Sequence, residues 1–110
     1  MRKSKPSATQ PVNAKNILVY QNYLAQNLTF PFLADRLAPI QPTEYVGGDL
    51  QILGINTDMD EYDLEFYGVL CDAKRNRRAI QIPLCDIHMR AGSPNQKLIE
   101  EYQDWFWNNR

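Results

Sequence analysis

The sequence predicts a small α+β domain in which two terminal helices cover a strongly bent antiparallel sheet or partial barrel. Two amphipathic stretches lie near the ends of the chain, and three strand-like runs lie between them. The 110 residues are 44% hydrophobic and 23% charged, which is typical of a single globular domain. We therefore expect one hydrophobic core.

Residues 1–15 differ from the rest of the chain in charge. They carry four basic side chains and no acidic one, whereas residues 16–110 carry eight basic and thirteen acidic side chains. Because this segment has little to bury, we expect residues 1–15 to be a disordered basic tail and residues 16–110 to be one α+β domain. The tail is interpreted as a solvated leader. A weak contact with nucleic acid or an anionic surface, or a transit peptide, are the alternatives.

An amphipathic helix is expected to follow the tail and to end near Asn27. Asn13 is suited to its N-cap position. Apolar side chains then recur at helical spacing, at Ile17, Tyr20, Leu24 and Leu28. The helix should stop there because residues 29–32 favour extended backbone and contain a proline.

Three strands are expected in the middle of the chain. Residues 30–46 contain three prolines and predict extended chain with at most one edge strand, and residues 46–49 predict a turn. The strand-like runs follow at residues 49–56, 64–73 and 77–84. Gly68 predicts a bulge or sharp bend inside the second run, and residues 74–76 predict a hairpin connection.

The last element is predicted to be a helix that begins with a capping box. Ser93 suits the N-cap, Pro94 the first helical position and Gln96 the third. The buried stripe is expected at Leu98, Tyr102, Trp105 and Phe106. Trp107 lies off this stripe, so we expect it to be partly exposed, where it either covers the mouth of the barrel or marks a partner surface.

No catalytic constellation is recognisable, and we expect the protein not to be an enzyme. The sequence contains no phosphate-binding glycine loop, nucleophile elbow or zinc-protease motif. Cys71 and Cys85 are expected to be buried reduced thiols, and His88 a partly exposed residue after the last strand. A zinc site would need further ligands beside these three residues and is not expected.

The densest charge feature is the acidic segment, which we define as residues 58–65. It holds five carboxylates and no cation, at Asp58, Asp60, Glu61, Asp63 and Glu65. In the predicted strand, Asp63 and Glu65 share one face while Leu64 and Phe66 point to the core. Clustered carboxylates repel one another, and a divalent cation relieves that repulsion. These five residues are therefore the candidate metal ligands.

Calcium is the ion that suits this segment best. It accepts about six to eight oxygen ligands in flexible geometry, whereas Mg²⁺ demands a tighter octahedron. The spacing is not that of an EF-hand loop, because Tyr62 and Val69 occupy ligand positions counted from Asp58. The alternative interpretation is a solvated loop that keeps the edge of a hairpin soluble.

A second charged cluster is basic and lies at the predicted hairpin. It consists of Lys74, Arg75, Arg77 and Arg78. Basic and aromatic residues together contact phosphates and bases, so a protein- or nucleic-acid-interaction module is the alternative function. A solvated hairpin tip that pairs with the acidic segment is the simpler interpretation. The expected partner is the calcium ion, a protein partner is the alternative, and nucleic acid is not expected. No apolar run is long enough for a membrane span, and the expected location is cytoplasmic.

Three stretches of the chain resemble the small bacterial calcium-binding proteins of the CcbP type. They are NYLAQNLTFPFLA at 22–34, YGVLCDAKRNRRAIQIPLCDI at 67–87 and NQKLIEEYQDWFWNN at 95–109. The family's acidic loop before a glycine-containing strand matches residues 58–65 in kind. The resemblance implies an SH3-like barrel and a calcium buffer or sensor that binds Ca²⁺ through surface carboxylates, with no enzymatic activity.

Overall fold

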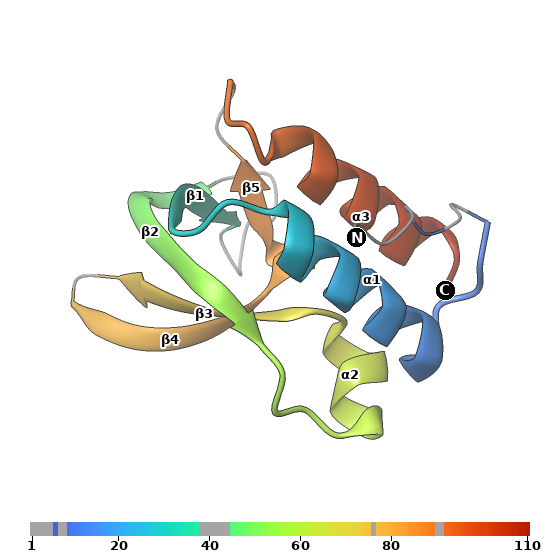
Figure 1. Cartoon of the computed structure of the whole chain (residues 1–110). Coiled ribbons are helices and arrows are strands. Elements are labelled where there is room, and N and C mark those ends of the chain that lie inside the picture. Colours follow the sequence, from blue (N-terminus) through green and yellow to red (C-terminus); the bar gives the residue numbers. More distant parts are fainter. Residues whose placement is uncertain (1–5, 7–8, 38–44, 76, 90–91) are drawn as a thin grey trace.

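The computed structural model describes residues 6, 9–37, 45–75, 77–89 and 92–110. Within these residues, three α-helices, one short 3-10 helix and a five-stranded antiparallel sheet make an α+β fold (Figure 1). In chain order the elements are α1 (Ala14–Asn27), β1 (Phe32–Leu37), β2 (Tyr45–Asn56), α2 (Glu61–Tyr67), β3 (Leu70–Arg75), β4 (Arg78–Pro83), η1 (Leu84–Asp86), β5 (Ile87–Met89) and α3 (Gln96–Asn108).

The sheet is open rather than a closed barrel. Its strand order is β4-β3-β2-β1-β5, so β4 and β5 are its two edges. Helices α1 and α3 run side by side over one face, and α2 lies at the end of the sheet below the start of α1 (Figure 1). The α+β class predicted from the sequence is confirmed, whereas the SH3-like barrel is not.

Helix α1 follows the prediction closely. The Asn13 side chain accepts a hydrogen bond from the backbone N–H of Asn16 at 2.9 Å, which makes Asn13 the N-cap. The predicted apolar stripe is buried at all four positions, namely Ile17, Tyr20, Leu24 and Leu28. The helix ends at Asn27, where extended backbone begins.

The segment before α1 contacts the end of α3 where it is described. The Trp105 Nε1 donates to the carbonyl of Gln10 at 2.8 Å, and the N–H of Val12 lies 3.4 Å from the carbonyl of Asn109. Ala14 and Lys15, predicted as the end of the tail, already belong to α1. The division of the chain into tail and domain stays a prediction, since most of residues 1–8 lie outside the described part.

The predictions for residues 30–49 need two corrections. Strand β1 is not an edge strand, because residues 34–36 pair with β5 on one side while the strand pairs with β2 on the other. Pro31 precedes β1 and so leaves its ladder intact. Residues 46–49 are not a turn but lie within β2, opposite an irregular step in the pairing with β1.

The largest correction concerns residues 64–73. The predicted second strand is in fact helix α2 followed by β3. Asp60 caps the start of α2, and Gly68 ends it with a positive φ of 72°, so the glycine is a helix C-cap rather than a bulge. Leu64 is buried as expected, but Phe66 points outward and is exposed.

Helix α3 supplies the aromatic part of the core. Its buried side chains are Ile99, Tyr102, Trp105 and Phe106, so the predicted stripe is confirmed except that Ile99 replaces the half-buried Leu98. The Tyr102 ring lies 5.2 Å from the ring of Tyr20 on α1, edge to face. These rings join α1 and α3 into one layer above the sheet.

The start of α3 differs from the predicted capping box. The helix begins at Gln96, and Gln96 accepts from the N–H of Gly92 rather than from that of Ser93. Asn95 is buried, and its amide both accepts from and donates to the backbone of Thr29, at 3.0 and 2.9 Å. Its side chain is therefore used to fix the loop after α1.

No described helix has the length and apolarity needed to span a bilayer.

Candidate functional site

The acidic segment forms the loop before α2 and the helix itself. The Oδ1 atom of Asn56 accepts from the N–H of Asp58 at 2.8 Å, and the Asp60 carboxylate accepts from the N–H of Asp63 at 2.8 Å. Glu61 and Asp63 lie in the first turn of α2, where the partial positive charge of a helix start stabilises carboxylates. Local backbone groups thus offset part of the repulsion within the segment.

Glu65 has a different task from the other four carboxylates. Its Oε2 atom accepts from the N–H of Ala14 at 2.9 Å, which is the first residue of α1. That N–H has no partner inside its own helix. Glu65 therefore ties α2 to the start of α1, a role that the sequence does not reveal because the two residues are 51 positions apart.

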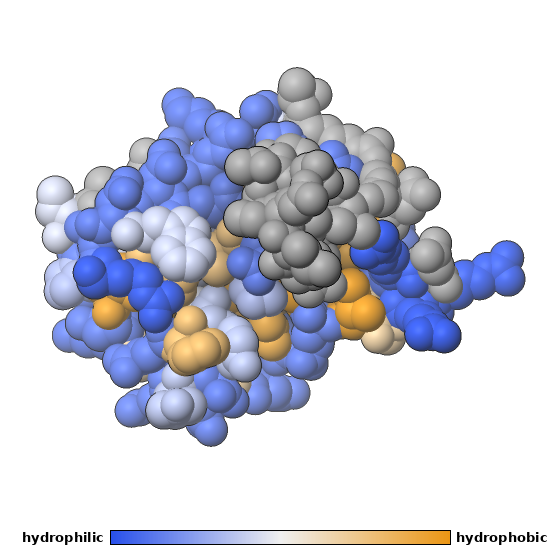
Figure 2. Space-filling model, turned by 180° about the vertical axis from the view of Figure 1, so that it is seen from behind, coloured by the Kyte–Doolittle hydropathy of each residue, from blue (hydrophilic) through white to orange (hydrophobic). Residues whose placement is uncertain are grey.

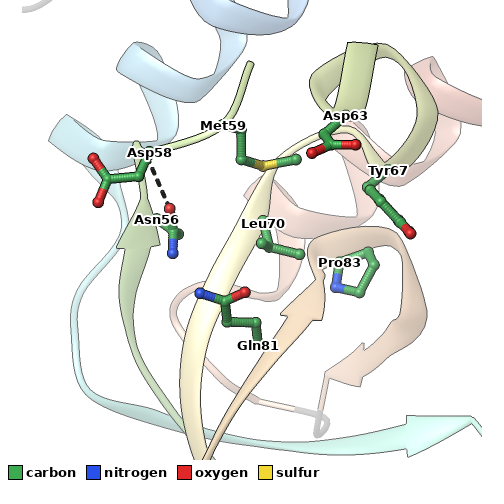
Figure 3. Close-up of a pocket in the computed structure, with 8 residues that line it drawn as sticks. All are labelled: Asn56, Asp58, Met59, Asp63, Tyr67, Leu70, Gln81 and Pro83. Atoms are coloured by element: carbon green, nitrogen blue, oxygen red, sulfur yellow. Dashed lines mark hydrogen bonds between the residues drawn. The ribbon is translucent and has the colours of Figure 1, made fainter. Parts of the chain in front are cut away.

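Two of the predicted ligands, Asp58 and Asp63, flank a pocket of about 450 Å³ (Figure 3). The pocket lies between the loop, α2, β3 and β4, and its other lining residues are Asn56, Met59, Tyr67, Leu70, Gln81 and Pro83. Figure 3 shows the Met59 side chain between the two carboxylates, with the Asp58 carboxylate turned outward. The structure thus places both residues on one pocket without bringing their carboxylates together.

The donor set of this pocket consists of oxygen atoms. Asp58 and Asp63 contribute carboxylates and Gln81 an amide oxygen, while the Asn56 Oδ1 atom already accepts from the N–H of Asp58. Asn56 is held by a second hydrogen bond, from its Nδ2 to Asp72 at 3.1 Å. Carboxylate and amide oxygens suit Ca²⁺, which tolerates varied coordination. Among the described residues, however, no three His, Cys, Asp or Glu side chains meet closely enough to form a metal site by themselves.

The two cysteines and the histidine do not form a reactive group. Cys71 is a buried free thiol and Cys85 a half-buried one, and burial raises the pKa of each to about 12. Both thiols are therefore protonated at neutral pH, which makes them poor nucleophiles. His88 is exposed on β5, where its backbone pairs with Asp35 of β1, so it belongs to the last strand rather than following it.

The basic hairpin lies away from the acidic segment. Lys74 and Arg75 end β3, Arg78 begins β4 opposite Arg75, and Arg77 occupies the turn with a positive φ of 68°. The acidic segment precedes the other end of β3, a distance of roughly 17 Å along a six-residue strand, as Figure 1 shows. The four cations therefore do not neutralise the candidate ligands, and their use in an interaction module stays a prediction.

Two contacts, one on α2 and one just after its C-cap, have no counterpart in the sequence prediction. The Arg110 guanidinium donates to the carbonyl of Glu65 at 3.1 Å, and the Tyr102 hydroxyl accepts from the N–H of Val69 at 2.8 Å. Neither has a local signal, because both join distant parts of the chain. The helix itself did have one, since Asp60 with Gly68 eight residues later is typical of a short capped helix.

Comparison with known proteins agrees with these observations. A family model described as calcium binding, of the CcbP type, matches residues 12–106. The crystal structure of Anabaena CcbP has the same fold with a TM-score of 0.60 and 18% identity, and the match covers 99% of this chain and 87% of that one. No curated protein matches the sequence. Because the family model spans nearly the whole chain, this protein belongs to the CcbP family of calcium-binding proteins, whose ion is Ca²⁺.

Proposed function

We propose that this protein binds Ca²⁺ through the carboxylates of the acidic segment, with Asp58 and Asp63 as the principal ligands. The observation that carries the proposal is their position on the two sides of one pocket that also holds the amides of Asn56 and Gln81. The Asp58 side chain is exposed, so no packing holds its carboxylate in the outward rotamer of Figure 3. Ca²⁺ supplies positive charge to a pocket whose described lining residues include no Lys, Arg or His.

The remaining three carboxylates have graded roles in this proposal. Asp60 and Glu65 each hold a backbone N–H with one carboxylate oxygen, so they position α2 and offer at most their second oxygen to the ion. Glu61 is exposed in the first turn of α2 and adds negative charge beside the site. With two full carboxylate ligands, the site should be weak and exchange its ion quickly, because calcium affinity rises with the number of charged ligands.

The proposed role is that of a buffer or sensor, without catalysis. The two free thiols agree with a reducing compartment such as the cytoplasm. A buffer needs only the site, whereas a sensor must transmit binding to another part of the molecule. Helix α2 offers such a route, since Glu65 contacts Ala14 and Arg110 contacts the end of the same helix.

An NMR titration with Ca²⁺ tests the site directly. We expect the amides of residues 56–65 and of Gln81 to shift in the wild-type protein at up to millimolar Ca²⁺. The double variant Asp58→Asn/Asp63→Asn should lose these shifts. Its matched control is Glu100→Gln/Asp104→Asn, which removes two exposed carboxylates from α3 and changes the net charge equally.

The two variants together make the result decisive. If the control loses the shifts and the double variant keeps them, the ion binds on α3 and the proposed ligands are wrong. The same spectra also distinguish the role of a buffer from that of a sensor. Shifts confined to residues 56–65 and 81 indicate a buffer, and shifts that extend to residues 13–16 and 105–110 indicate a sensor.

A further inference from the structure

The exposed aromatic side chains of the described chain gather at one corner of the molecule. Tyr62, Phe66 and Tyr67 on α2 are 77%, 60% and 43% exposed, and Trp107 at the end of α3 is 58% exposed. Every other described aromatic side chain is buried or half-buried. We call these four residues the aromatic corner.

The members of the aromatic corner form one connected surface. The rings of Phe66 and Tyr67 meet edge to face at 4.7 Å. The Arg110 guanidinium bonds to the carbonyl of Phe66 and stacks on Phe106 at 4.4 Å, and it lies 5.9 Å from the Trp107 ring. Figure 2, which views the molecule from behind, shows pale and orange patches interleaved with blue at the lower left of the surface. Arg110 thus bridges α2 and α3.

The fold does not use these aromatic rings for its core. In α2 the buried side chain is Leu64, and Tyr62 and Phe66 stand one turn apart on the solvent side. Clustered exposed apolar surface is unusual for a monomer and marks interaction sites, where Trp, Tyr and Arg supply most of the binding energy. The aromatic corner has this composition.

Charge decides which partner fits. Glu61, Asp63 and Glu65 alternate in sequence with the aromatic residues of α2, and Arg110 is a cation that contacts the same helix. In a two-fold symmetric pair of chains that meet through this corner, these carboxylates would face their own equivalents, and like charges placed together repel. Nucleic acid and anionic membranes are repelled in the same way. A segment that is both basic and apolar is attracted.

We propose that the aromatic corner docks a basic, amphipathic segment of another protein. The apolar face of that segment covers Tyr62, Phe66 and Trp107, and its Lys or Arg side chains pair with the carboxylates of α2. Tyr67 also lines the neighbouring pocket, whose walls include Leu70 and Pro83. One side chain of the segment therefore has a hollow to enter, as the anchor residues of protein interfaces do. This hollow and Asp63 are shared with the proposed calcium site, but docking does not require bound Ca²⁺.

The test uses a model peptide of leucine and lysine with helical amphipathic spacing. Its control is the same peptide with glutamate in place of lysine. Binding is followed by amide shifts and by the fluorescence of Trp107, which is exposed, whereas Trp105 is buried. We expect the lysine peptide to shift amides of residues 61–67 and 105–110 and the glutamate peptide to bind at least about tenfold more weakly.

Variants locate the contact. Tyr62→Ser/Trp107→Ser should weaken binding at least about tenfold, because both rings are lost from the surface. Leu18→Ser/Val19→Ser removes two exposed apolar side chains from α1 and should leave the affinity unchanged. Amide spectra show that each variant is folded, and Tyr62→Ser alone serves if the double variant is not. Equal binding of both peptides, equal loss in both variants, or self-association of the chain through this corner would overturn the proposal.

Discussion

Helices α2 and α3 carry similar residues and use them in opposite ways. Helix α3 turns Tyr102, Trp105 and Phe106 into the core, whereas α2 turns Tyr62 and Phe66 into solvent. A helix such as α3 is held by its own buried face. A seven-residue helix with one buried leucine is not, and it depends on contacts that reach it from elsewhere.

Those contacts come from the start of α1 and from residues 102–110 at the C-terminal end of the chain. Glu65 bonds to Ala14 at the start of α1, and Arg110 bonds to the last carbonyls of α2. Behind α2, the hydroxyl of Tyr102 holds the N–H of Val69. Helix α2, which bears Asp63, is therefore a surface element held in place by residues of α1 and of the C-terminal region.

Alkaline pH should have the largest effect on stability, because it ionises buried tyrosine and cysteine side chains in the core against which α3 packs. Burial, with help from Glu101, raises the pKa of Tyr20 to about 12, and burial also raises the pKa values of Cys71 and Tyr102. The unfolded chain ionises these groups from about pH 9 to 10. Stability is therefore complete below that range and is lost as pH rises toward 12.

Circular dichroism against pH, with tyrosine ionisation followed by absorbance, checks this prediction. We expect the tyrosine absorbance of the buried rings to change together with loss of the helical signal. Buried tyrosines that ionise near pH 10 while the fold persists would contradict the assignment of α3 as the protected side.

Gly68→Ala should destabilise the protein more than any other substitution proposed here for α2 and its contacts. A methyl group there would press against the hydroxyl of Tyr102 and lie 2.7 Å from the ring of Phe106, and the positive φ disfavours alanine. We expect a loss of about 3 kcal/mol in the free energy of unfolding, measured with urea. The matched control is Gly54→Ala, whose methyl group meets no atom within 4 Å. Equal losses at both positions would show that Gly68 is not a close-packed joint.

Tyr102→Phe should destabilise the protein less than Gly68→Ala, and it tests the difference between α3 and α2 directly. The substitution keeps the ring and leaves the buried N–H of Val69 without its acceptor, so the expected loss is about 1–3 kcal/mol. Tyr62→Phe makes the same chemical change on the exposed side of α2 and should cost less than about 0.5 kcal/mol. Similar losses for both variants in thermal unfolding would remove the distinction between the two helices.

Glu65→Ala and Arg110→Ala should have the smallest global effects. Each removes an exposed hydrogen-bonding partner, and a lost helix cap typically costs about 1 kcal/mol. Amide hydrogen exchange should be faster in residues 61–67 and unchanged in the interior of α3. Uniform acceleration in both helices would mean that α2 does not open by itself.

The sequence predicted the elements that bury a periodic face. The stripe at Ile17, Tyr20 and Leu24 marked α1, and Tyr102 with Phe106 marked α3, because tertiary packing requires apolar residues at helical spacing. Helix α2 escaped this rule. Its single buried residue, Leu64, has no periodic partner, and the aromatic residues around it resemble those of a strand.

Strand position and the site geometry depended on long-range contacts. Ala34 pairs with both Leu50 and Met89, and nothing in the local pattern of β1 announces the second partner. The charge of the acidic segment was recognisable in the sequence, but the different roles of its carboxylates were not. Asp60 and Glu65 became helix-positioning groups, and Gln81 reached the pocket of Asp58 through the pairing of β3 with β4.

The interior place of β1 has a consequence for the order of folding. Its outer side is completed by residues 87–89, more than fifty positions further along the chain. During synthesis β1 and β2 can pair early, but the hydrogen-bonding groups on that outer side stay open until β5 has left the ribosome. Any nascent or truncated chain that stops before Met89 therefore presents an unprotected template for aggregation.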